Sequence, residues 1–66
     1  MKKFHVNLKK LRKERKVQQK DMAEYLGVSI RTYQRYEHGE LEPNIEKIIR
    51  LAYYFGVTTD YLLGKD

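Results

Sequence analysis

The chain has 66 residues, 41% hydrophobic and 35% charged, which allows one small domain over residues 1–66 and excludes a disordered tail or a membrane protein. It contains no cysteine, which excludes disulfides, cysteine-based zinc sites and thiol catalysis and is typical of the reducing cytoplasm. The net charge is +5, but the charges are unevenly distributed: residues 1–20 hold nine Lys or Arg and one Glu, whereas residues 21–66 hold five Lys or Arg and eight Asp or Glu. We therefore expect one side of the molecule to meet an anionic partner.

Two short amphipathic helices are predicted in the N-terminal half, over about residues 7–15 and 18–26. The first helix turns its lysines outward. Its basic charge has two equally good explanations: a lysine-rich helix that simply faces water, or a surface that meets an anionic partner. The second ends at Gly27, because glycine best adopts the left-handed conformation that closes a helix. The residues expected to face the core are Leu8, Leu11, Met22, Ala23 and Leu26.

Three further helices are predicted, each beginning at a capping residue and ending at a glycine. They cover about residues 29–37, 44–55 and 58–63, with Ser29, Asn44 and Thr58 as N-caps and Gly39, Gly56 and Gly64 as terminators. The core-facing residues of the helix over 44–55 are expected to be Ile45, Ile48, Ile49, Ala52 and Phe55, and the last helix carries Tyr61, Leu62 and Leu63. Because no segment alternates with period two for long enough to form a strand, we predict an all-α fold, a compact five-helix bundle.

The second and third predicted helices are separated by Gly27, Val28 and Ser29 alone. Such a short connection favours two helices crossing at about 90–120°, the geometry of a helix-turn-helix. Ala23 supplies the small residue that this crossing needs. The spacing therefore predicts a helix-turn-helix over about residues 18–38, although a simple helical hairpin with the same apolar pattern is an alternative.

The third predicted helix has two different faces. Its core face contains Tyr33, Tyr36 and Glu37, and its opposite face contains Ile30, Arg31, Gln34 and Arg35. The residue types on the second face are those that bind base edges in the DNA major groove, since Arg pairs with guanine, Gln with adenine and an alkyl group with the thymine methyl. Two alternatives to base contact remain open. Ile30 packs against the second helix, or one of the two arginines binds only a backbone phosphate.

A larger set of residues resembles the phage repressor and Cro-like helix-turn-helix family, also called the Xre family. The resemblance lies in Gln19 to Gly27 with Val28-Ser29, in Tyr36-Glu37-His38-Gly39, in Pro43, and in Gly56-Val57-Thr58 followed by Asp60 to Leu63. It implies a lambda-repressor-like fold and a DNA-binding transcriptional regulator, a repressor. Such a protein is expected to bind a palindromic operator in double-stranded DNA as a homodimer, through residues near the fourth and fifth helices.

The resemblance also implies roles for individual residues. A residue matching Gln19 contacts backbone phosphate, and Arg12 pairs with Glu37. Lys20 is also expected to bind phosphate, because it lies at a helix N-terminus, which favours anions. The exposed lysines of the first helix are expected to add a weaker attraction to the DNA. The base-reading residues are expected to be Ile30, Arg31, Gln34 and Arg35, and the phosphate-binding residues Gln19, Lys20, Ser29 and Thr32.

The Arg12–Glu37 pair also follows from physical chemistry. Glu37 lies on the inward arc of its helix, and a buried carboxylate needs a cationic partner. The alternative is that Glu37 faces water beside His38. The chain departs from the family pattern at three positions: Gln18 replaces a usual cap residue, Lys16 stands near a common glycine, and Tyr33 is bulkier than the usual aliphatic residue.

Other functions receive less support from the sequence. His5 and His38 are the only histidines and show no metal-ligand spacing, so we expect no enzyme, no metal or other cofactor and no small-molecule substrate. A protein-interaction module, such as an antitoxin or adaptor with the same fold, is the main alternative, with an aromatic patch of Tyr53, Tyr54 and Tyr61. Binding of single-stranded nucleic acid is disfavoured because the tyrosines lie away from the basic end.

Overall fold

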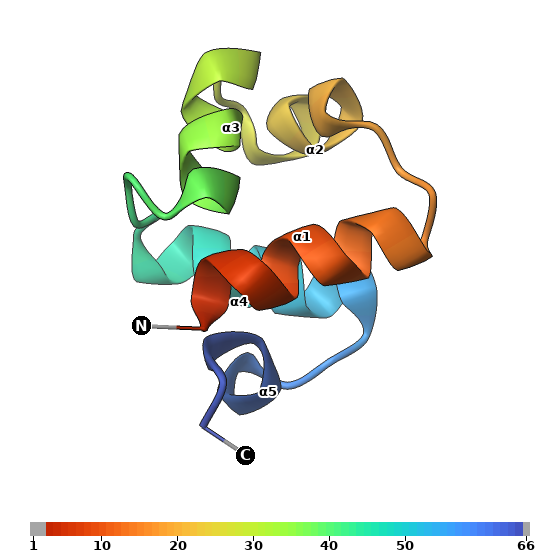
Figure 1. The fold of residues 1–66 in the computed structure, drawn as a ribbon, viewed down its shortest axis with the longest axis vertical. Helices are drawn as coiled ribbons and strands as arrows, with labels where there is room; N and C mark the ends of the chain where they lie inside the picture. The colour runs from red at the N-terminus through yellow and green to blue at the C-terminus, as the bar shows by residue number, and fades with distance from the viewer. Residues whose placement is uncertain (1–2, 66) are drawn as a thin grey trace.

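Five α-helices form within residues 3–65, the residues that the structure, a computed structural model, describes. They are α1 (Phe4–Glu14), α2 (Gln19–Leu26), α3 (Ile30–His38), α4 (Ile45–Phe55) and α5 (Thr59–Leu63). Figure 1 shows α2 and α3 at one end of the molecule, α1 and α4 across its middle, and α5 at the other end. The predicted all-α class and the five helices are confirmed. Met1, Lys2 and Asp66, which belong to the predicted domain, lie outside the described residues.

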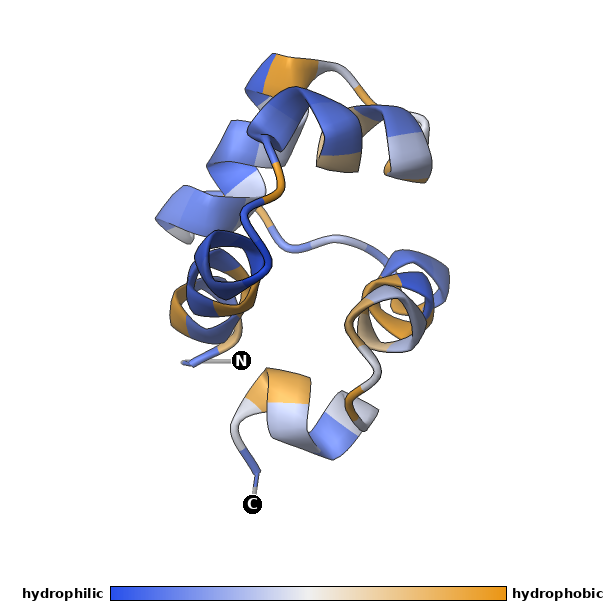
Figure 2. Cartoon of the chain, turned by 90° about the vertical axis from the view of Figure 1, so that its right-hand side faces the viewer, coloured by the Kyte–Doolittle hydropathy of each residue, from blue (hydrophilic) through white to orange (hydrophobic). Residues whose placement is uncertain are grey.

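All five helices contribute to one hydrophobic core. Turning the molecule by 90° shows that α1 and α4 form two sides of this core, closed by α2 and α3 at one end and by α5 at the other (Figure 2). Burial of these apolar side chains is the main favourable contribution to folding. The buried apolar residues are Phe4, Leu8, Leu11, Met22, Ala23, Leu26, Tyr33, Tyr36, Ile48, Leu51, Ala52, Phe55 and Leu62.

Three of the helices begin at the predicted capping residues. The side chains of Ser29, Asn44 and Thr58 each accept a hydrogen bond from the backbone N–H three residues later, at 3.1, 2.9 and 2.9 Å. Each bond satisfies a backbone donor that the helix itself leaves unpaired. Gln18, which precedes α2, makes no such bond. The predicted starts of α3, α4 and α5 are therefore confirmed within one residue.

The predicted start of α1 was wrong. The helix begins at Phe4 rather than near residue 7, and the Phe4 side chain is 2% exposed. Phe4 lies four residues before Leu8 on the same helical face, so it extends the buried stripe by one turn. The side chain of Asn7 then donates to the backbone carbonyls of Tyr61 and Leu62, at 3.1 and 3.2 Å, which attaches α1 to the end of α5.

The predicted core face of α4 was also partly wrong. Ile45 and Ile49 are 74% and 53% exposed, whereas Leu51, which was not predicted to be buried, is completely buried. The apolar residues of α4 cover more than half of its circumference, and the bundle covers only the side that contains Ile48, Leu51, Ala52 and Phe55. On α5, Leu62 is buried, Leu63 is half-buried and Tyr61 is 41% exposed.

The connection between α1 and α2 contains a backbone conformation that glycine favours. Lys16 has a φ of 57°, and it is the only non-glycine residue with a positive φ between residues 3 and 65. It ends α1 in the left-handed conformation, after which the backbone N–H of Val17 donates to the carbonyl of Arg12 at 3.2 Å. A side chain in this conformation costs about 1–2 kcal/mol.

We expect the Lys16→Gly variant to be more stable than the wild type by about 1 kcal/mol, because relief of the left-handed strain exceeds the added flexibility of the unfolded chain. Urea unfolding followed by circular dichroism measures this difference. Lys13→Gly is the matched control, since Lys13 lies inside α1, and there the same substitution should lower stability by about 1 kcal/mol. If both variants lose stability, the left-handed conformation of Lys16 is not strained and the prediction is wrong.

Candidate nucleic-acid interface

The connection between α2 and α3 has the predicted helix-turn-helix geometry. Gly27 adopts a left-handed conformation with a φ of 72°. The backbone N–H of Val28 donates to the carbonyl of Ala23 at 3.0 Å, and Ala23 itself is 3% exposed. The small alanine side chain allows α3 to pack closely against α2. This packing holds α3 at the end of the molecule with one long face uncovered (Figure 1).

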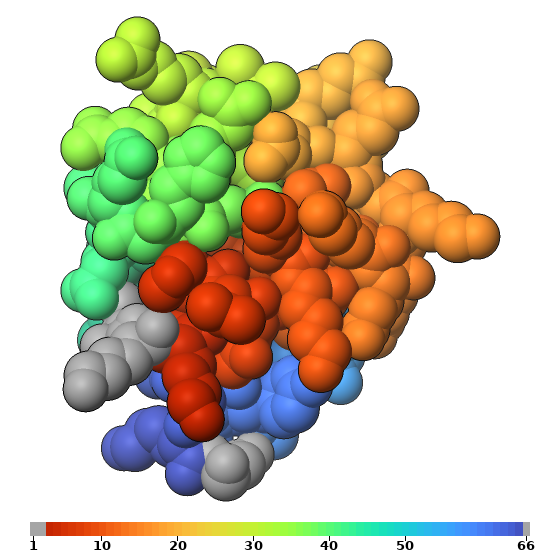
Figure 3. Space-filling model, viewed as in Figure 1, coloured from red at the N-terminus to blue at the C-terminus, as the bar shows by residue number. Residues whose placement is uncertain are grey.

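The uncovered face of α3 contains most of the predicted base-reading residues. Ile30 is 47% exposed, so it does not pack fully against α2, and Arg31 is exposed as well. The Arg31 side chain makes no hydrogen bond or ion pair with another residue of the range 3–65. The side chains of α3 project from the upper edge of the surface in Figure 3. Lys20, at the start of α2, is also exposed.

Arg35 has an acidic neighbour that the sequence analysis did not identify. Its Nε lies 3.6 Å from a carboxylate oxygen of Glu40, and both side chains are about half exposed. The other carboxylate oxygen of Glu40 lies 3.9 Å from the His38 ring. Exposed pairs of this kind contribute at most about 1 kcal/mol, so Arg35 remains available to a stronger anionic partner.

Ser29 and Thr32 are joined to each other. The Ser29 hydroxyl accepts the capping bond from the Thr32 backbone and donates to the Thr32 hydroxyl oxygen at 3.1 Å. Because the Ser29 proton is used in this way, the Thr32 hydroxyl keeps its own proton for an outside acceptor. Of the two hydroxyls, the one on Thr32 is therefore the better donor to a phosphate oxygen.

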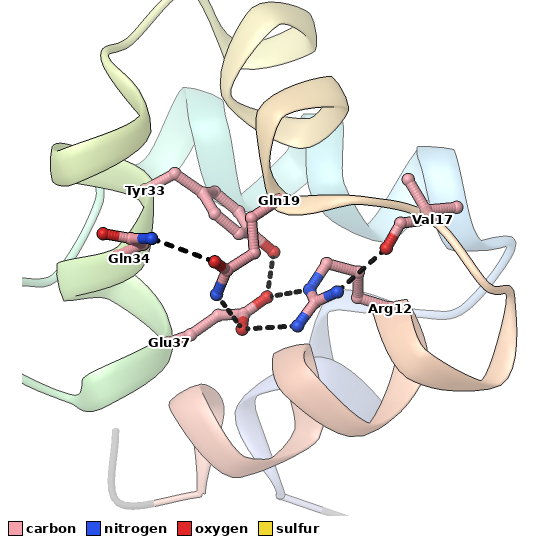
Figure 4. Close-up of polar contacts among 6 residues, drawn as sticks. All are labelled: Arg12, Val17, Gln19, Tyr33, Gln34 and Glu37. Carbon is pink, nitrogen blue, oxygen red and sulfur yellow. Dashed lines mark hydrogen bonds and ion pairs between the residues drawn. The ribbon is translucent and has the colours of Figure 1, made fainter.

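A buried ion pair lies directly behind this surface. The Arg12 Nε and Nη2 atoms of α1 donate to the two carboxylate oxygens of Glu37 in α3, at 2.6 and 3.1 Å (Figure 4). The Glu37 side chain is 0% exposed and that of Arg12 is 12% exposed. The third guanidinium nitrogen, Nη1, donates to the backbone carbonyl of Val17 at 2.9 Å. This geometry excludes the alternative that Glu37 faces water beside His38.

Two further residues donate to the same carboxylate. The Tyr33 hydroxyl donates to Oε2 of Glu37, and the Gln19 Nε2 donates to Oε1 at 3.1 Å. A carboxylate accepts about four hydrogen bonds, so all of its acceptor positions are used. The large Tyr33 side chain thus supplies a donor that an aliphatic residue at this position would lack. The arrangement joins α1, α2 and α3 at one point (Figure 4).

The charge state of Glu37 follows from these contacts. Burial by itself raises the pKa of Glu37, but the hydrogen bonds from Arg12, Tyr33 and Gln19 favour the ionised form more strongly, so the pKa is lowered overall. Burial and the hydrogen bond to Glu37 raise the pKa of Tyr33. Tyr33 therefore stays a protonated donor and Glu37 stays an ionised acceptor at neutral pH.

The lowered pKa of Glu37 predicts a loss of stability in acid. Since the folded pKa lies below the unfolded value, the stabilisation is complete above the unfolded pKa, about 4.3, and disappears as the pH falls through the folded pKa. We expect the free energy of unfolding, measured with urea between pH 7 and pH 3, to fall less steeply in Glu37→Gln than in the wild type. The control Glu24→Gln removes an exposed carboxylate and should keep the wild-type decline; equal slopes for all three proteins would contradict the prediction.

Gln19 and Gln34, predicted to contact phosphate and base, are bonded to each other. The Gln34 Nε2 donates to the Oε1 of Gln19 at 3.1 Å, and both side chains are half-buried (Figure 4). A row of hydrogen bonds therefore extends from the Arg12–Glu37 pair through Gln19 to Gln34 on the exposed side of α3. The sequence predicted separate roles for Gln19 and Gln34 and no contact between them. The signal that links them is the position of Gln19 at the start of α2, opposite the middle of α3.

Residues 3–65 contain no group of three or more His, Cys, Asp or Glu side chains that could hold a metal ion. No helix in the same range is long and apolar enough to cross a membrane.

Comparison with known proteins identifies the family of this fold. The sequence profile of a helix-turn-helix family matches residues 8–62, which is most of the chain. The chain belongs to this helix-turn-helix family. The predicted resemblance to phage repressors is thereby confirmed.

Relatives with similar sequences are bacterial and phage regulators. The chain is 42% identical over 60 residues to the uncharacterized HTH-type transcriptional regulator YqaE of Bacillus subtilis, covering 91% of this chain and 52% of YqaE. It is 37% identical over 54 residues to the cryptic phage CTXphi transcriptional repressor RstR of Vibrio cholerae, covering 82% of this chain and 49% of RstR. The chain thus spans about half the length of these curated relatives.

Two solved structures share the fold. A transcriptional regulator from Listeria innocua superposes with a TM-score of 0.90 and 46% identity, over 92% of this chain and 57% of that protein. The DNA-binding domain of the P22 C2 repressor superposes with a TM-score of 0.82 and 30% identity, over 91% of this chain and 79% of the domain. The lambda-repressor-like fold is therefore confirmed.

Proposed function

We propose that this chain is the DNA-binding part of a cytoplasmic repressor, and that it recognises a specific sequence by inserting α3 into the major groove of double-stranded DNA. The observation that carries the proposal is the exposed face of α3, where Ile30 is 47% exposed and the exposed Arg31 side chain makes no hydrogen bond or ion pair within residues 3–65. An α-helix of this size fits the major groove, which is about 12 Å wide.

Each residue of the interface has a proposed role. Arg31 and Arg35 pair with guanine, Gln34 with adenine, and Ile30 contacts a thymine methyl group. Gln19, Lys20, Ser29 and Thr32 hold the phosphates that border the groove, helped by the N-terminus of α2. The Arg12–Glu37 pair stays inside the protein and fixes α3 against α1. In this arrangement the phosphate contacts set the position of the helix and the base contacts provide specificity.

Selection of bound sequences from a random duplex library tests the proposal. We expect an enriched near-palindromic motif that contains guanine in each half. The Arg31→Ala/Arg35→Ala double variant should lose this enrichment. A wild-type protein that enriches no motif would contradict sequence-specific binding, and an interaction module of the antitoxin or adaptor kind would keep its protein affinity in the double variant.

We further propose that two copies bind one palindrome and contact each other through α4. The half-sites of such operators lie about 34–36 Å apart, and this molecule measures 29 × 23 × 19 Å along its principal axes, so one copy fits on each half-site beside the other. An apolar stripe on α4, defined as Ile45, Ile49 and Tyr53, is 74%, 53% and 84% exposed. Beside it a groove of about 510 Å³ opens between α4 and α5. A second copy would bury this stripe against its own equivalent.

We expect the Ile49→Glu variant to lose cooperative binding to the full palindrome. Its affinity for the palindrome should fall at least about tenfold, because each copy would bury a charge in the contact, while its affinity for one half-site should stay unchanged. Val6→Glu is the matched control, since Val6 is 56% exposed on α1, outside the stripe. Titrations of half-site and full-site duplexes measure both quantities. Unchanged cooperativity in Ile49→Glu would assign the stripe to another partner, such as a further segment of a longer chain, and overturn the dimer proposal.

A further inference from the structure

The chain of hydrogen bonds from Glu37 to Gln34 has a fixed direction. Glu37 is buried and ionised, so its carboxylate accepts hydrogen bonds and donates none. The amide of Gln19 must therefore turn its Nε2 toward Glu37, at 3.1 Å, and its Oε1 toward Gln34. Gln34 in turn must offer its Nε2 to that oxygen, also at 3.1 Å. The orientation of both amides follows from the charge of one interior residue.

This direction determines what Gln34 offers to an outside partner. One hydrogen of its Nε2 is used inside the protein, and the carbonyl Oε1 points away from Gln19 (Figure 4). A free glutamine side chain can rotate its amide and present either a donor or an acceptor, and rotation here would place two carbonyl oxygens against each other. Gln34 is half-buried on the exposed side of α3, where this oxygen is within reach of DNA.

We propose that Glu37, acting through Gln19, sets the base preference of Gln34. The Gln34 carbonyl selects an exocyclic amino group, which adenine or cytosine presents on the contacted strand. It rejects guanine and thymine. The inference rests on the proposed DNA-binding function and adds a specificity-determining role for two residues that need not touch a base. In the major groove, adenine N6 and cytosine N4 are donors, whereas guanine O6 and thymine O4 are acceptors. Adenine fits best, because the second Nε2 hydrogen can also reach its N7.

A Gln19→Met variant tests this role. Methionine has a similar length but neither donates nor accepts like an amide, so the Gln34 amide becomes free to rotate. Glu37 keeps the donors from Arg12 and Tyr33, which supports folding of the variant. The base position under Gln34 is first located as the one whose preference is lost in Gln34→Ala. At that position the wild type should prefer adenine or cytosine, and Gln19→Met should accept guanine and thymine within about threefold of the preferred base.

Two controls and the pattern of the Gln19→Met effect separate this role from simpler ones. Gln18→Met changes the exposed neighbour, which makes no capping bond, and should leave the profile unchanged. If Gln19→Met only removed a phosphate contact, binding to all DNA sequences would weaken equally. If it frees the Gln34 amide to rotate, the base preference changes at one position. In the Gln34→Ala background, Gln19→Met should have no further effect on that position. An unchanged profile in single Gln19→Met would overturn the inference.

A second variant tests the orientation with Gln19 itself unchanged, although it removes the hydrogen bond that Gln34 donates to Gln19. Glutamate at position 34 can only accept, so Gln34→Glu should keep the preference for adenine or cytosine even if repulsion from DNA phosphates lowers its affinity. If the preference switches in Gln34→Glu, the wild-type amide presents its donor and the inference is wrong. These outcomes differ from failure of the proposed function, in which the wild type itself would enrich no motif.

Discussion

Replacing Arg12 with alanine should lower the free energy of unfolding by about 3–5 kcal/mol, because it leaves the Glu37 carboxylate buried without its cation. Glu37 is 0% exposed and receives two of its four hydrogen bonds from Arg12. Small domains are stable by about 0.05–0.15 kcal/mol per residue, so this loss removes a large part of the total. Urea unfolding and the Tm, both followed by circular dichroism, measure the effect.

Two comparisons identify the cause of that loss. Lys13→Ala removes an exposed charge from the next position of α1 and should change stability by less than about 0.5 kcal/mol. The Arg12→Met/Glu37→Met double variant removes both charges and should be more stable than Arg12→Ala, since no charge is left unpaired. If Arg12→Ala is as stable as Lys13→Ala, the pair contributes little and does not fix α3 in place.

Replacing Arg31 or Arg35 with alanine should weaken binding to the selected operator by about 1–3 kcal/mol and relax the preference at one base position for each variant. The physical reason is that a bidentate contact to guanine is lost and no other base can replace it. Binding titrations with the operator and with duplexes that carry single base changes measure the affinity and the preference. Arg35 should show the smaller effect, since Glu40 partly neutralises it before DNA binds.

Lys20→Ala provides the contrast to these variants. Lys20 is exposed at the start of α2, where it is proposed to hold a phosphate. Its loss should weaken binding to all sequences alike and reduce the slope of log affinity against log salt by about 1. If Lys20→Ala and the arginine variants have the same effect across unrelated duplexes, the division into base readers and phosphate contacts is wrong.

The sequence predicted the local features of the fold well. Ser29, Asn44 and Thr58 cap their helices because an N-cap depends on a side chain and the backbone three residues away, a contact that the sequence alone defines. Gly27 and the short connection after it predicted the helix-turn-helix for the same reason. For Lys16 the sequence indicated only that it stands near a position where glycine is usual, and its left-handed conformation was not predicted.

Features that depend on distant segments were predicted less well. Ile49 and Leu51 are both apolar, and their positions on α4 do not say which side the other helices will cover; the structure buries Leu51 and exposes Ile49. Phe4 was missed because its burial depends on the packing of α1 against the rest of the core, which local sequence does not define. An apolar pattern broader than the available core thus leaves the burial of individual residues undetermined.

The candidate site shows the same division. The outward face of α3 follows from helical periodicity, so Ile30 and Arg31 were placed correctly as exposed residues. The bond between Gln19 and Gln34 joins two helices across 15 positions of sequence, and hydrogen bonds between side chains of different elements depend on tertiary packing. Sequence identifies which residues face outward, and the structure adds which of them are already held by a partner.

Methylation interference on the selected operator tests most directly whether α3 enters the major groove. Dimethyl sulfate modifies guanine at N7 in the major groove and adenine at N3 in the minor groove, and the proposed arginine contacts use guanine N7 and O6. We predict that N7-methylguanine within each half-site prevents binding of the wild type, and that Arg31→Ala or Arg35→Ala becomes insensitive to methylation of the guanine it no longer contacts. Binding that tolerates every N7-methylguanine and is blocked by N3-methyladenine would place the protein in the minor groove and contradict recognition through α3.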